Sequence, residues 1–242
     1  MILLIDIGNS RLKWALWDGA TLSPAVAIDH QGDPAMVIGR LPNRKLSAVW
    51  VAHVMGAGHE DAINNAVRAR FAFDAHFARS CAEYLGLKCA YADATRLGVD
   101  RWLMLLAAWR EVHDACCVVS AGTALTFDAI DAEGQHQGGF IAPGLSAMLK
   151  ATLGSTRFAT FELGSDYQDG LGRDTETCVR QGAFLAALGA IERGLLAAGT
   201  PDVRLACGGD AAVLLPHLGE TWQQRDDLVL RGLLVLAIST KV

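Results

Sequence analysis

The sequence predicts an α/β fold with two similar domains, and three observations favour it. Apolar segments typical of buried strands alternate with segments whose apolar residues recur at helical spacing. Residues 4–10 and 118–124 share one strand-turn pattern at an offset of 120 − 6 = 114 residues, close to half of the 242-residue chain. A glycine turn follows a predicted strand in three places, at Gly8, Gly122 and Gly208. We therefore predict one domain over residues 1–114 and a second over residues 115–242.

The first domain is predicted to open as strand, turn and strand. Residues 3–7 form an apolar run that ends in Gly-Asn, and residues 12–17 follow with β-compatible side chains and close on Asp-Gly. Residues 47–54 indicate another buried strand, and residues 60–71 indicate a helix. A further helix rich in leucine and alanine is expected over residues 101–113.

The second domain is predicted to repeat this opening. Residues 116–119 and 125–130 indicate two strands around the second glycine turn. Residues 138–144 are interpreted as a glycine-proline loop, residues 145–153 as a short helix and residues 154–174 as a polar loop.

The end of the chain is predicted to be mostly helical. Residues 175–198 favour a long helix with Gly199 as its C-cap. A strand over residues 203–207 leads through Gly-Gly to a helix from Ala211, and residues 228–238 favour a last helix.

Composition narrows the class of protein. With 52% hydrophobic residues, 19% charged residues and a net charge of −5, the chain lacks the basic footprint of a nucleic-acid-binding protein. No run approaches the length of about 20 apolar residues that spans a bilayer, and the start lacks a basic signal-peptide segment. The six cysteines form no Cys-x-x-Cys pair, so we expect reduced thiols and no zinc. A soluble, cytoplasmic protein without a nucleic-acid or membrane partner is expected.

The first glycine turn carries residue types that bind phosphate. In Asp6-Ile7-Gly8-Asn9-Ser10 the glycine allows a close backbone approach, and the side chains of Asn9 and Ser10 are donors. Asp6 would hold magnesium directly or through water, and Lys13 on the next strand would meet a phosphate. An ordinary β-hairpin with a polar turn has the same local pattern.

Two further turns offer similar chemistry. Ser120-Ala121-Gly122-Thr123 supplies hydroxyl and amide donors, although a plain hairpin is again the alternative. Gly208 and Gly209 end a strand and open a helix, which suits a nucleotide lying against bare backbone. Three such turns suit the two-domain actin-like (ribonuclease H-like) and sugar-kinase architecture, with ATP in a cleft between the domains.

The segment Gly98-Val99-Asp100-Arg101 places a carboxylate beside a guanidinium at a predicted helix start. A kinase acting on an alcohol needs a base for the hydroxyl proton and a fixed cation that orients the substrate. Asp100 and Arg101 fit these roles. The alternative is an N-cap aspartate followed by a surface arginine.

Taken in order, these motifs resemble the type III pantothenate kinases, actin-like enzymes that open coenzyme A synthesis. The matching residues are Asp6-Ile7-Gly8-Asn9-Ser10, Tyr91, Gly98-Val99-Asp100-Arg101, Gly122-Thr123-Ala124, Thr126, Asp128, residues 138–144, Gly172-Arg173-Asp174-Thr175-Glu176, Gly208-Gly209 and Asp227-Leu228-Val229-Leu230. The resemblance implies ATP-dependent phosphorylation of pantothenate by a homodimer whose substrate pocket includes residues from both subunits.

The resemblance also implies roles for individual residues. Asp100 would accept the hydroxyl proton. ATP would be bound by Asp6, Ile7, Gly8, Asn9, Ser10, Arg11, Leu12, Lys13, Gly122, Thr123, Gly208 and Gly209. Pantothenate would be bound by Tyr91, Gly98, Val99, Asp100, Arg101 and Thr175. Arg101 would either pair with the substrate carboxylate or anchor Asp100.

Two positions depart from the family pattern. Family members usually carry aspartate at the position of Ser120, where it helps to hold an activating potassium or ammonium ion. A serine hydroxyl lacks that charge, so we expect weak dependence on a monovalent cation. Ala94 stands where the family often has proline. A regulatory accessory factor with the same fold, or a kinase for another small alcohol or acid, remains an alternative.

Overall fold

The computed structural model describes residues 1–155 and 167–240, and the chain forms two compact units. The first unit comprises Met1–Glu111 and Asp227–Val242, and the second comprises Val112–Asp226. The predicted division after residue 114 lies three residues further along the chain than this one (114 − 111 = 3). The prediction also assigned the C-terminal segment to the second domain, whereas it groups with the first unit.

The first unit is built on a five-stranded sheet with the order β3-β2-β1-β4-β5. Its strands are β1 (Ile2–Ile7), β2 (Arg11–Trp17), β3 (Val26–Asp29), β4 (Ala48–His53) and β5 (Ala75–Phe77). A small hairpin is formed by β6 (Glu83–Tyr84) and β7 (Leu87–Lys88). The helices are α1 (Pro34–Arg40), α2 (Glu60–Phe71), α3 (Val99–Val112) and α7 (Leu228–Ser239), with short 3-10 helices at Ala57–His59 and Ala94–Arg96.

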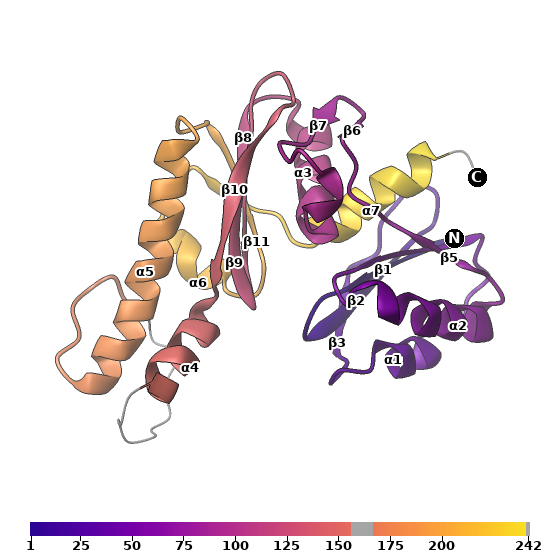
Figure 1. Cartoon of the computed structure of the whole chain (residues 1–242), viewed down its shortest axis with the longest axis horizontal. Helices are drawn as coiled ribbons and strands as arrows, with labels where there is room; N and C mark the ends of the chain where they lie inside the picture. Colours follow the sequence, from indigo (N-terminus) through magenta and orange to yellow (C-terminus); the bar gives the residue numbers. More distant parts are fainter. Residues whose placement is uncertain (156–166, 241–242) are drawn as a thin grey trace. The chain divides into compact units, whose positions relative to one another are not determined.

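The two faces of this sheet carry different residues of β1. Leu3, Ile5 and Ile7 of β1 join a buried cluster with side chains of α1 and α2, which lie side by side on that face (Figure 1). Successive strand residues point to opposite faces, so Asp6 lies on the other face. Helix α7 also packs against β1. The carboxylate predicted to hold magnesium is thus on the face away from the cluster formed with α1 and α2.

Helix α7 joins the first unit through a close backbone contact with α3. A Cβ on Gly232 of α7 would lie 2.0 Å from the carbonyl oxygen of Leu103 in α3. Only glycine permits this approach, because no real side-chain carbon lies so close to a backbone oxygen. This contact explains physically why the C-terminal helix groups with the first unit.

The second unit has a five-stranded sheet with the order β10-β9-β8-β11-β12. Its strands are β8 (Cys116–Ala121), β9 (Ala124–Ile130), β10 (His136–Pro143), β11 (Val203–Cys207) and β12 (Trp222–Gln224). Its helices are α4 (Leu145–Ser155), α5 (Thr175–Ala197) and α6 (Ala211–Leu214), with a 3-10 helix at Leu215–His217. One cluster buries Phe127 of β9 against Phe184 of α5, which runs along the sheet in Figure 1.

The two sheets have the same plan, as the repeated motif predicted. In each, the first strand pairs antiparallel with the second, and the second pairs antiparallel with the third. The first strand also pairs parallel with the fourth, and the fourth with the fifth. The prediction of an α/β fold with two similar domains is confirmed at the level of sheet topology.

Some local predictions were wrong. The glycine-proline segment is mostly not a loop: its residues 138–143 belong to β10 and pair with β9, with a register shift between His136 and Gly138, and Gly144 follows the strand. The helix from Ala211 spans only four residues, Ala211–Leu214. Within the predicted polar loop, residues 156–166 lie outside the described residues, and residues 167–174 contain neither helix nor strand.

Candidate active site

The first turn joins β1 to β2 and exposes the predicted phosphate-binding side chains. Asp6 and Lys13 are direct cross-strand partners just below the turn. The Gly8 N–H donates to the Arg11 carbonyl oxygen at 3.0 Å, while Asn9 and Ser10 are exposed. A Cβ on Gly8 would meet its nearest heavy atom, the Arg11 oxygen, at 3.5 Å, an ordinary contact. Glycine therefore keeps the outer surface of the turn bare rather than relieving strain within it.

Four charged side chains of the first unit gather below this turn. The Lys13 Nζ lies 3.5 Å from Asp227 Oδ1. Burial, the largest cause, and the negative charges of Asp100 and Asp227 together raise the pKa of Asp6 to about 7, and the positive charge of Lys13 opposes this shift. Asp6 offers a hard oxygen ligand of the kind that magnesium takes one or two at a time from a protein, together with phosphate oxygens and water.

Asp227 has a role that sequence reasoning missed. It immediately precedes α7 with a left-handed φ of 60°, and its side chain makes no capping hydrogen bond to that helix. Its carboxylate instead contacts Lys13, which is 214 positions away in the sequence. An aspartate before a helix indicates an N-cap from local pattern alone, so no local signal pointed to this ion pair.

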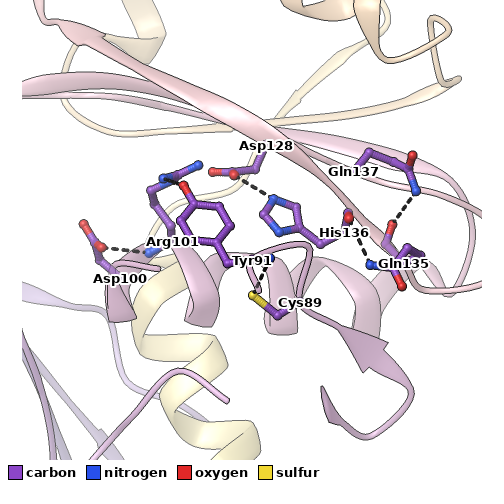
Figure 2. A network of polar contacts seen from close by, with 8 residues as sticks. All are labelled: Cys89, Tyr91, Asp100, Arg101, Asp128, Gln135, His136 and Gln137. Carbon is purple, nitrogen blue, oxygen red and sulfur yellow. Dashed lines mark hydrogen bonds and ion pairs between the residues drawn. The ribbon is translucent and has the colours of Figure 1, made fainter. Parts of the chain in front are cut away.

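The segment that contains Asp100 folds differently from the prediction. Asp100 is the second residue of α3, after Val99, and is not its N-cap. Its Oδ1 accepts a hydrogen bond from the Arg101 backbone N–H at 2.9 Å (Figure 2). A Cβ on Gly98 would lie 2.6 Å from that same oxygen, so glycine at this position leaves room for the carboxylate. The segment thus holds Asp100 at the start of the helix.

Two residues predicted to bind substrate contact each other. The Arg101 Nη1 donates to the Tyr91 hydroxyl at 3.1 Å, and the Tyr91 N–H donates to Cys89 Sγ at 3.4 Å (Figure 2). Arg101 is only 3% exposed. The prediction of a surface arginine, which was the alternative, is therefore wrong.

The second turn, at residues 121–124, is enclosed by glycine backbone. The Gly144 N–H donates to the Thr123 carbonyl oxygen at 3.2 Å, and a Cβ on Gly144 would lie 2.0 Å from the Gly122 oxygen. Gly208 has a φ of 97°, and a Cβ there would lie 2.1 Å from the Ala121 oxygen. Glycine at position 208 therefore allows close packing against the backbone of Ala121, whereas a Cβ on Gly209 would meet nothing within 4 Å. Of the pair, only Gly209 presents open backbone.

Beside the second turn lie two hydroxyl side chains, where the first turn has the charged side chains of Asp6 and Lys13. Ser120 of β8 pairs in register with Thr126 of β9. Thr126 is buried, and its Oγ1 has no hydrogen-bond partner among the described residues. Asp128, further along β9, is fully buried and its Oδ1 lies 3.0 Å from His136 Nε2 (Figure 2). The two hydroxyls provide neutral oxygens near the turn, without a free carboxylate of the kind found at Asp6.

Thr175 lies in the second unit, at the exposed start of α5. Asp174 caps that helix: its Oδ1 accepts from the Thr177 N–H at 2.8 Å. The surrounding cavity has a volume of about 720 Å³. It is lined by Thr152, Gly172, Arg173, Asp174, Thr175, Cys178, Val179, Gly182 and Ala183. This volume is in the range of small-molecule pockets.

Two further features of the described residues bear on function. They contain no group of three or more histidine, cysteine, aspartate or glutamate side chains arranged to hold a metal ion. None of the helices within residues 1–155 and 167–240 has the length and apolar character needed to cross a membrane.

Solved structures show what the fold resembles. A Campylobacter jejuni protein described as a Baf family transcriptional activator matches with a TM-score of 0.64 at 20% identity, over 98% of each chain. A Sinorhizobium meliloti protein described as a 2-dehydro-3-deoxygalactonokinase matches with a TM-score of 0.63 at 14% identity, over 99% of each chain. The predicted actin-like and sugar-kinase fold is confirmed.

Sequence comparison identifies the family. A family model described as type III pantothenate kinase matches residues 2–196. The type III pantothenate kinase of Nitrosospira multiformis is 35% identical over 249 aligned residues, which cover 99% of this chain and 92% of that relative. The resemblance drawn from the motifs is confirmed, and the chain belongs to the type III pantothenate kinase family.

Proposed function

We propose that this protein transfers the γ-phosphoryl group of ATP to the primary hydroxyl of pantothenate, the first step of coenzyme A synthesis. The family match over residues 2–196 carries this proposal. It is supported by the gathering of Asp6, Lys13 and Asp100 within one unit of the structure. We further propose that the protein works in the cytoplasm.

The first turn is the main phosphate-binding element. Its exposed Asn9 and Ser10, the backbone from Ile7 to Leu12 and the Lys13 ammonium would bind the phosphates of ATP. Thr123 and the open backbone at Gly209 would be further nucleotide contacts. Asp6 would hold magnesium directly or through water. Magnesium supplies neutralisation of the charge that develops on the phosphates.

Asp100 is the proton acceptor. The pantothenate oxygen forms a bond to the γ-phosphorus, the bond to the oxygen of ADP breaks, and the hydroxyl proton passes to the Asp100 carboxylate. Glycine at position 98 leaves that carboxylate room at the helix start. The remaining catalysis is positioning and charge neutralisation, as in other phosphoryl transfers.

The residues proposed to bind pantothenate fall into two sets. Tyr91, Val99 and Arg101 belong to the first unit, and Thr175 belongs to the second. The Arg101 guanidinium, oriented by Tyr91, would pair with the pantothenate carboxylate. The cavity beside Thr175 supports a pocket completed by a second copy of the chain, so we propose a homodimer.

The second turn would bind a monovalent cation only weakly. Ser120 and Thr126 offer two hydroxyl oxygens without a negative charge. Neutral oxygens can replace part of a hydration shell, but they add no Coulomb attraction. We therefore propose that potassium or ammonium activates this enzyme less than it activates relatives with aspartate at this position.

The test is ADP release with and without pantothenate, in the wild type and in Asp100→Asn. Loss of the base is expected to lower kcat by about 10²–10⁴-fold and to leave ATP affinity nearly unchanged. Asp61→Asn is the matched control, because Asp61 is also the second residue of a helix but is exposed. Wild-type protein that binds ATP without pantothenate-dependent turnover would favour a regulatory protein, and turnover with another alcohol would favour a different kinase.

A further inference from the structure

His30 is a fully buried histidine that follows β3 and contacts the first turn. Its Nε2 lies 2.9 Å from the Gly8 carbonyl oxygen, and the Gly32 N–H donates to its Nδ1 at 3.1 Å. A nitrogen that accepts a hydrogen bond carries no proton, so the ring proton lies on Nε2. The His30 ring therefore donates to the backbone of the phosphate turn.

The backbone of His30 makes the same connection a second time. Its N–H donates to the Ser10 carbonyl oxygen at 3.3 Å, and its carbonyl oxygen accepts from the Asp33 N–H at 2.7 Å. Asp33 is the N-cap of α1, and its Oδ1 accepts from the Met36 N–H at 3.0 Å. One buried residue thus ties two carbonyls of the turn to the capped start of a helix.

The bond to Gly8 fixes the direction of a neighbouring donor. The chain contains no cis peptide bond among the described residues, so the Gly8–Asn9 peptide is planar and trans. In such a peptide the N–H points opposite to the C=O. Because the Gly8 oxygen points to buried His30, the Asn9 N–H points away from it, toward the exposed side of the turn.

We propose that His30 is a positioning residue for ATP, which orients the Gly8–Asn9 peptide so that the Asn9 N–H donates to a phosphate oxygen. This inference rests on the proposed role of the first turn. It adds a residue outside that turn on which phosphate binding depends. His30 does not touch ATP; it removes the rotational freedom of a peptide that does.

Two substitutions separate the two ring bonds. In His30→Gln the side-chain amide can reach the position of Nε2 and keep the donor to Gly8, while the acceptor for Gly32 is lost. In His30→Asn the amide oxygen can reach the position of Nδ1 and keep the acceptor, while the donor to Gly8 is lost. Each variant loses one hydrogen bond at the same buried site, so each is a control for the other.

The readout is the Kd for ATP, measured by titration without pantothenate, together with the melting temperature. Loss of one orienting bond is expected to weaken ATP binding by about tenfold in His30→Asn. His30→Gln is expected to stay within about twofold of the wild type, although both variants melt at lower temperatures. Equal weakening in both variants, or unchanged affinity in His30→Asn, would overturn the inference.

A measurement on the wild type covers the case in which a variant does not fold. In ¹⁵N-labelled protein, the Asn9 amide signal is expected to be among the most strongly shifted when ATP is added. An Asn9 amide that does not respond to bound ATP overturns the role of His30, while the proposed function stands. Wild-type protein that binds no ATP overturns both proposals.

Discussion

The turn after β1 and the turn after β8 occupy equivalent places in two sheets of the same strand order, but their chemistry differs. The first has Asp6 and Lys13 directly below it and is held by the His30 ring. The second has the hydroxyls of Ser120 and Thr126 below it and is held by glycine backbone. The first turn is fixed by hydrogen bonds from His30, and the second by backbone hydrogen bonds together with close backbone contacts at Gly144 and Gly208.

This difference predicts that the two turns contribute differently to catalysis and to stability. A turn with carboxylates and a lysine beside it can bind magnesium and phosphate. The protonation state of these carboxylates also depends on their charged neighbours. A turn between two glycines offers a fixed shape with few charges. Stability should therefore depend more on the second turn, and catalysis more on the first.

The largest effect on stability is expected from Gly208→Ala. The new Cβ would lie 2.1 Å from the Ala121 carbonyl oxygen at a φ of 97°, so the backbone must shift. We expect a loss of about 3 kcal/mol or more in the free energy of unfolding, measured by urea denaturation. Gly209→Ala is the control, because its Cβ meets nothing within 4 Å. Equal stability of the two variants would contradict the role of the second turn.

The next prediction compares how much each turn contributes to kcat/KM for ATP. Lys13→Ala removes an ammonium beside the phosphates and is expected to lower kcat/KM for ATP by about 10²-fold. Thr123→Ala removes one neutral hydroxyl and is expected to cost less than about tenfold. Lys45→Ala, at an exposed lysine far from the turn in sequence, is the control. A larger loss in Thr123→Ala would reverse the proposed division of work.

Asp6→Asn is expected to stabilise the protein in a pH-dependent way. The unfolded carboxyl ionises near 3.8 and the folded one near 7, so the native state binds more protons between these values. Wild-type stability therefore falls as the pH rises from about 4 to 7, and the variant escapes this loss. Without ATP or magnesium, we expect a gain of about 2–4 kcal/mol at pH 8 and little gain near pH 4.

Asp18→Asn should behave in the opposite way. Hydrogen bonds from Thr21 and Ala20 lower the pKa of Asp18, so its stabilising contribution is present above the unfolded pKa and is lost as the pH falls. The variant should be less stable than the wild type at neutral pH. Urea denaturation of both variants at pH 4 and pH 8 measures the contrast. If Asp6→Asn raises the free energy of unfolding equally at both pH values, the raised pKa of Asp6 is not the cause of the gain.

The smallest effect concerns the monovalent cation. Replacing potassium by sodium is expected to change wild-type kcat/KM by less than about threefold, because Ser120 and Thr126 supply no charge. Ser120→Asp should increase the potassium dependence, and Ser120→Asn is the neutral control. Strong loss of wild-type activity in sodium would show that the second turn needs no carboxylate to bind the ion.

Local pattern predicted most elements of the fold. The helix predicted at residues 60–71 has the bounds of α2, and the opening hairpin was predicted within one residue at each end. The failure at β10 has a physical cause. Gly138 has a φ of 95° at a register shift, so a glycine that marks an irregular strand was interpreted as a loop. This segment forms a strand because it pairs with β9, and such pairing cannot be read from the local sequence.

The candidate site was predicted only in parts. Asp6, Lys13 and Asp100 were found because each lies in a recognisable short motif. Their gathering with Asp227, and the bond from His30 to Gly8, depend on contacts 214 and 22 positions apart in the sequence. Neither residue stands in a local pattern that differs from an ordinary helix cap or turn. Such partners become visible only when the sheet brings distant segments together.

The most direct test of the proposed reaction is the identity of its product. The purified protein is incubated with ATP, magnesium and pantothenate, and the mixture is followed by ³¹P NMR and mass spectrometry. The account predicts equal amounts of ADP and of pantothenate phosphorylated on its primary hydroxyl, with Asp100→Asn forming almost none. ATP binding without phosphorylated pantothenate, or product formation that survives in Asp100→Asn, would contradict it.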